Sequence, residues 1–131
     1  MSIQKERYLK DLENIQVGEL KELVVNGRNC AIYRAKDGHL NGYAYWGNKN
    51  PLTEEEAFDL DFLVHGGVTY FGALPNRNGN YIGFDCNHYR DWTIDYSLDY
   101  MFNDCTYKDY NFVKNELAIL VEEINTYQGA D

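Results

Sequence analysis

The chain has 131 residues, with 12 Lys and Arg against 21 Asp and Glu, so its formal net charge is −9. This length allows one domain, and the content of 44% hydrophobic and 15% aromatic residues excludes a disordered acidic tail. No apolar run reaches the roughly 20 residues of a membrane span, and Met1–Lys10 has no signal-peptide stretch. We therefore expect a soluble, cytoplasmic protein that contacts no membrane.

The first half of the chain has the pattern of one helix followed by an antiparallel meander. The apolar stripe Tyr8, Leu9, Leu12 and Ile15 predicts a helix, and Asn26-Gly27 is a strong signal for a tight β-hairpin. The predicted elements are a helix over Ser2–Gln16 with Ser2 as its N-cap, and strands over Leu23–Val25, Cys30–Ala35 and Tyr43–Trp46.

The second half predicts a short helix, a further hairpin and a long helix. Thr53 and Glu56 have the spacing of a capping box, and Val113, Leu117, Leu120 and Ile124 form one helical stripe. The predicted elements are a helix near Glu54–Phe58, strands over Val68–Leu74 and Tyr81–Cys86, and a helix capped by Thr106 and running to Tyr127. This order predicts a single α+β domain, with about five mostly antiparallel strands and both the N-terminal and the C-terminal helix packed on them.

The three cysteines, Cys30, Cys86 and Cys105, are odd in number and have no CxxC spacing. A disulfide framework and a zinc ribbon are therefore not expected, and free thiols are the default interpretation. We expect no cofactor.

Two polar clusters stand at the ends of the predicted hairpin strands. His65 precedes one strand, and Asp85 and His88 lie at the end of the next. Antiparallel pairing places the start of one strand beside the end of the other, so we expect His65 to lie near Asp85 and His88.

Several roles fit these residues. His65, Asp85 and His88 are types that ligate a transition metal, with Asp91 orienting an imidazole; alternatively His88 acts as a general acid or base. A structural hydrogen-bond network is the competing interpretation, as is a Cys86–His88 nucleophile pair. The residues predicted to bind a small nucleotide-type ligand, through a glycine anion nest, an arginine and aromatic rings, are His65, Gly66, Gly67, Tyr70, Asp85, His88, Arg90 and Trp92.

The acidic residues form two blocks without intervening bases. From these blocks we predict an acidic surface for a partner, formed by Glu54, Glu55, Glu56, Asp59, Asp91, Asp95 and Asp99. The net charge argues against direct nucleic-acid binding, because such binding neutralises phosphates with Lys and Arg. Acidity fits a basic protein partner or mimicry of a phosphate array, while solubility alone is the simpler explanation.

The segments His65-Gly66-Gly67-Val68-Thr69-Tyr70 and Ile82-Gly83-Phe84-Asp85-Cys86-Asn87-His88, with the helix that follows, resemble a family of small uncharacterised proteins encoded by bacteriophages and prophages. That family has patterns similar to HGGxTY and IGFDxxH, and the resemblance covers about residues 62–125. It implies an accessory gene of a phage or mobile element.

From these features we expect a non-enzymatic accessory protein that acts by binding and counters host defence. It would capture a nucleotide-type signal, or block a host effector such as a CRISPR nuclease through its acidic surface. The alternatives are a small metal- or histidine-dependent hydrolase centred on His65, Asp85 and His88, and a structural protein. The sequence leaves the oligomeric state open.

Overall fold

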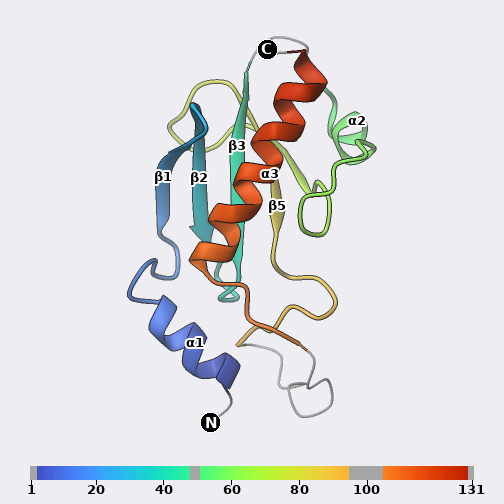
Figure 1. Cartoon of the computed structure of the whole chain (residues 1–131). Coiled ribbons are helices and arrows are strands. Elements are labelled where there is room, and N and C mark those ends of the chain that lie inside the picture. Colours follow the sequence, from blue (N-terminus) through green and yellow to red (C-terminus); the bar gives the residue numbers. More distant parts are fainter. Residues whose placement is uncertain (1–2, 48–50, 95–104, 130–131) are drawn as a thin grey trace.

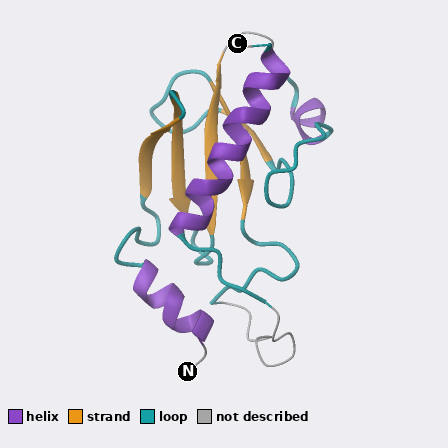
Figure 2. Cartoon of the chain, viewed as in Figure 1, coloured by secondary structure: helices purple, strands orange, loops and turns teal. Residues whose placement is uncertain are grey.

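A five-stranded antiparallel sheet with one long helix across one face forms the body of the protein (Figures 1 and 2). The computed structural model describes residues 3–47, 51–94 and 105–129. The elements are α1 (Ile3–Asp11), β1 (Leu20–Val25), β2 (Arg28–Arg34), β3 (Leu40–Gly47), α2 (Glu54–Phe58), β4 (Tyr70–Gly72), β5 (Asn80–Asp85) and α3 (Tyr110–Gln128). The strand order is β1-β2-β3-β5-β4, which confirms the predicted α+β fold.

The two-residue turn predicted at Asn26-Gly27 joins β1 to β2. Both residues have positive φ, 48° and 81°, as a type I′ turn requires. Val25 pairs with Arg28 directly beside the turn. The turn therefore sets the register of the first hairpin. β1 begins three residues before its predicted start, whereas β2 begins two residues early and ends at Arg34, one residue short of its predicted end.

The apolar stripe of α3 packs on the sheet as predicted. Val113, Leu117, Leu120, Val121 and Ile124 are fully buried against residues of the central strands. Alternation along each strand turns one side chain in two toward the helix. Within the described residues, no helix combines the length and the apolar character needed to cross a membrane.

The predicted N-cap of α3 is wrong by three residues. Asp109, not Thr106, accepts the N–H of Phe112 and caps the helix. Thr106 instead forms a parallel bridge with Asp91, and its N–H bonds to the carbonyl of Arg90. The segment before α3 is therefore held by the chain that follows β5.

The predicted N-terminal helix is too long at its C-terminal end. It ends at Asp11 rather than Gln16, and Ser2, its predicted N-cap, lies outside the described residues. The chain turns after Asp11 because Arg34 draws in both the Asp11 carboxylate and the carbonyl of Ile15. Leu9, assigned to the apolar stripe, is 42% exposed.

Arg34 is a fully buried cation at the end of β2. Its guanidinium donates to the Asp11 carboxylate at 3.2 Å, to the carbonyls of Ile15 and Gly38, and to the hydroxyl of Tyr107 at 2.9 Å. Tyr107 also donates to Asp11, and burial raises its pKa above its ordinary value. These contacts attach α1 and the segment before α3 to the sheet, as buried charges require full pairing.

The second hairpin is shorter than predicted. The capping box at Thr53 and the bounds of α2 are confirmed, but β4 covers only Tyr70–Gly72 of the predicted Val68–Leu74. Leu74 leaves the ladder and packs with Tyr43 and Tyr81 on the sheet face opposite α3.

Candidate functional site

The predicted meeting of His65 with the end of β5 is confirmed. β4 and β5 pair antiparallel, Tyr70 with Gly83, and the rings of His65 and His88 lie 5.8 Å apart. The His65 ring also meets the Phe112 ring of α3 edge-on at 5.1 Å. The two imidazoles thus lie on the α3 side of the sheet, in a half-buried position.

Asp91 connects this cluster. Its side chain is 1% exposed, and it accepts a hydrogen bond from Nε2 of His65, at 2.9 Å and 3.0 Å to its two oxygens. It also accepts the N–H of His88 at 3.0 Å and lies 3.1 Å from Nζ of Lys108. One carboxylate thereby joins three separate stretches of the chain.

The pKa of Asp91 reflects two opposing effects. Burial alone would raise it, but the hydrogen bonds from His65, from the His88 amide and from Lys108 together lower it below its ordinary value. Asp91 is therefore an ionised anchor at neutral pH. It was predicted as part of an acidic partner surface, and that prediction is wrong because its carboxylate is buried and paired.

The His88 ring is partly exposed, but its Nε2 atom is buried. Nε2 of His88 lies 3.0 Å from Oδ1 of Asp85, but the groups are not aligned as a hydrogen bond. A Cβ atom at Gly66 would lie 2.2 Å from the same nitrogen. The glycine is therefore explained by the close approach of the His88 ring.

The predicted anion nest at Gly66 and Gly67 is already partly used within the turn. Both residues have positive φ, 71° and 77°, and the N–H of Gly67 donates to the carbonyl of Val64 at 2.7 Å. This turn delivers His65 to the cluster.

Two observations concern the metal-ligand and Cys86-nucleophile roles predicted for this cluster. Among the described residues, no group of three or more His, Cys, Asp or Glu side chains is arranged to hold a metal ion. Burial, with the Asp91 and Asp85 charges, raises the pKa of the Cys86 thiol far above its ordinary range. Cys86 is thus a protonated core residue. The hydrogen bonds of the cluster agree with the structural hydrogen-bond network that the sequence analysis gave as one interpretation of His65, Asp85 and His88.

The remaining residues of the predicted ligand site do not share this location. Tyr70 lies on the opposite sheet face, against Tyr43. Trp92 is buried in an aromatic group with Tyr8 and Tyr107. The side chain of Arg90 is exposed, with its guanidinium 5.7 Å from the Tyr89 ring.

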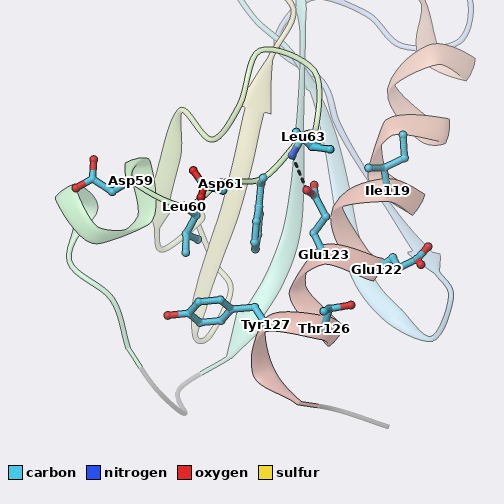
Figure 3. A pocket seen from close by; sticks show the side chains of 10 residues that line it. Asp59, Leu60, Asp61, Leu63, Ile119, Glu122, Glu123, Thr126 and Tyr127 are labelled. Atoms are coloured by element: carbon cyan, nitrogen blue, oxygen red, sulfur yellow. Dashed lines mark hydrogen bonds between the residues drawn. The ribbon is translucent and has the colours of Figure 1, made fainter.

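A groove that the sequence did not predict lies between α3 and the segment that follows α2 (Figure 3). Its volume is about 650 Å³. The residues that line it are Asp59, Leu60, Asp61, Phe62, Leu63, Ile119, Glu122, Glu123, Thr126 and Tyr127. The alternation of acidic and apolar residues over 59–62, joined to the exposed positions of α3, is the sequence signal that could have indicated it.

Two carboxylates of α3 fix one wall of this groove. Glu123 accepts the N–H groups of Leu63 at 2.5 Å and Val64 at 3.2 Å, and Glu116, two helical turns earlier, accepts the N–H of His65 at 2.9 Å. Figure 3 shows the first of these bonds crossing from α3 to the loop. The wall is therefore continuous with the histidine cluster at His65.

Four of the other predicted acidic surface residues are exposed, and one of these lines the groove. Glu54, Glu55 and Glu56 are exposed on α2, and Asp59 is exposed at the groove. Asp95 and Asp99 lie outside the described residues.

Together the fold and the groove define a small α+β protein with a helix-backed antiparallel sheet and an acidic surface around an apolar recess. No protein-family model, curated protein or solved structure matches this chain. The phage resemblance therefore stays a prediction from the two motifs.

Proposed function

We propose that this protein acts by binding a basic protein partner through the acidic surface around the groove. One observation carries the proposal: residues 51–67 contain five Asp and Glu, residues 115–128 contain three, and neither segment contains a Lys or Arg. The groove and the bonds from Glu123 bring the two segments together. Charge of one sign on one side of a protein steers and selects partners of the opposite charge.

The charges remain available to a partner. Asp59, Asp61 and Glu122 are exposed, and within the described part of the chain none of the three carboxylates accepts a backbone N–H as Glu116 and Glu123 do. Exposed charges interact with a partner over a distance of about 10 Å at moderate salt. Asp59, Asp61 and Glu122 are therefore the residues we assign to partner binding.

In the phage setting that the motifs predict, the partner would be a host effector that itself binds nucleic acid. Basic protein surfaces of that kind neutralise phosphates, and an array of carboxylates can compete for them. The proposal thus retains the prediction that the protein counters host defence by blocking a host effector through its acidic surface.

The proposal is tested with a flexible peptide rich in Lys and Arg and with no amphipathic order. We expect the wild-type protein to bind it with an affinity that falls at least about tenfold between about 50 and 500 mM salt, as screening requires. The triple variant Asp59→Asn, Asp61→Asn, Glu122→Gln should lose about tenfold in affinity at low salt. Titration calorimetry measures both.

A matched control separates the acidic surface from net charge. The variant Glu6→Gln, Glu13→Gln, Asp37→Asn removes three exposed carboxylates outside the groove. Its affinity should stay within about twofold of the wild type. An equal loss in both triple variants would show that only net charge matters and would contradict the proposal.

A further inference from the structure

The groove is apolar inside its acidic rim. Leu63, Ile119 and Tyr127 line it and are 86%, 42% and 50% exposed. Leu60, from the segment after α2, also lines the groove (Figure 3). Exposed apolar side chains gathered around a recess with a polar rim mark interaction sites. The apolar lining therefore requires a partner that presents apolar side chains as well as positive charge.

The groove wall cannot accept an added β-strand at Leu63–His65. The N–H groups of Leu63, Val64 and His65 are already bonded to Glu123 and Glu116. Strand addition depends on free main-chain donors and acceptors, whereas an amphipathic helix is recognised by its side chains alone. The recess therefore favours recognition of a helical surface.

Charge opposes the pairing of two copies of the chain through this recess. The chain carries a net charge of −9, and pairing two identical grooves would bring Asp59, Asp61 and Glu122 against their own copies. Like charges across an interface oppose association. A cationic partner has no such repulsion.

Building on the proposed function, we infer that the groove binds an amphipathic helix of the basic partner. Large apolar side chains on one face of that helix enter the recess between Leu63, Ile119 and Tyr127. Lys or Arg side chains flanking that face lie against Asp59, Asp61 and Glu122. The apolar contacts give the helix its specificity, and the carboxylates set its orientation.

The test compares two peptides of identical composition. One is an amphipathic Leu/Lys helix of about 18 residues, or roughly five turns; the other is the same set of residues in an order without amphipathic periodicity. We expect the helical peptide to bind at least about tenfold more tightly. Leu63→Ala should reduce that affinity about tenfold, since it removes exposed apolar contact area.

Val24→Ala is the matched control, because Val24 is an exposed aliphatic residue on β1. It should leave the affinity for the helical peptide unchanged. Equal binding of both peptides, or no effect of Leu63→Ala, would overturn the helix assignment and leave the proposed function standing. Binding of neither peptide would overturn both. Self-association in sedimentation that Leu63→Ala abolishes would identify a second copy as the occupant and overturn the inference.

Discussion

Replacing Asp91 by alanine should destabilise the protein strongly at neutral pH. The change leaves the N–H of His88 and Nε2 of His65 without their acceptor and removes the counter-ion of Lys108. Breaking a fully buried ion pair costs about 3–5 kcal/mol. Since His65 and Lys108 keep some contact with water, we expect a loss of about 2–3 kcal/mol in the free energy of unfolding.

The assay is equilibrium unfolding in urea. With a slope near 2 kcal/mol per molar, the midpoint should fall by about 1–1.5 M while the slope stays unchanged. Asp37→Asn is the control, because Asp37 is exposed in a turn that Asn also favours. Its midpoint should match the wild type.

The difference in unfolding free energy between the wild type and Asp91→Ala depends on pH, and the direction of this dependence follows from the pKa of Asp91. The folded-state pKa of Asp91 lies below its ordinary value of 3.8. Its contribution is therefore complete above about pH 5 and is lost as the pH falls through the folded-state pKa. The gap between wild type and Asp91→Ala should shrink in acid. A gap that is absent at pH 7, or that does not shrink between about pH 5 and about pH 2, would refute this account of Asp91.

Two further substitutions test the packing and the buried charge. Gly66→Ala should lower the melting temperature much more than Gly67→Ala. Both residues have positive φ, but only at Gly66 would the added Cβ lie 2.2 Å from Nε2 of His88, and equal effects would contradict this close approach. Arg34→Met should cost about 3–5 kcal/mol in urea unfolding by leaving Asp11 buried without its cation. Adding Asp11→Leu should recover part of that loss; a double variant less stable than Arg34→Met alone would argue against the pair.

Local features of the chain predicted much of the fold. The Asn26-Gly27 turn, the Thr53 capping box and the α3 stripe each depend on residues within a few positions of one another. Pairing of the second hairpin also followed from short-range signals, and with it the approach of His65 to His88.

Some residues had a sequence signal that pointed the wrong way. Arg34 shares a strand face with the core residue Ile32, yet a charged side chain in a strand is ordinarily read as solvent-exposed. Asp91 belongs to a run of acidic residues that resembles a solvated surface. Each is buried because cationic or anionic partners far along the chain compensate its charge.

By itself, the sequence determined the fold class, the turns and the apolar face of α3, because periodicity and turn chemistry act over neighbouring residues. Only the tertiary structure decided which charges meet. Asp91 pairs with Lys108, and Arg34 pairs with Asp11. Glu123 accepts the N–H groups of Leu63 and Val64, which lie 59 or more positions earlier in the chain. Such pairs form where packing brings distant segments within hydrogen-bond range, and the groove exists for the same reason.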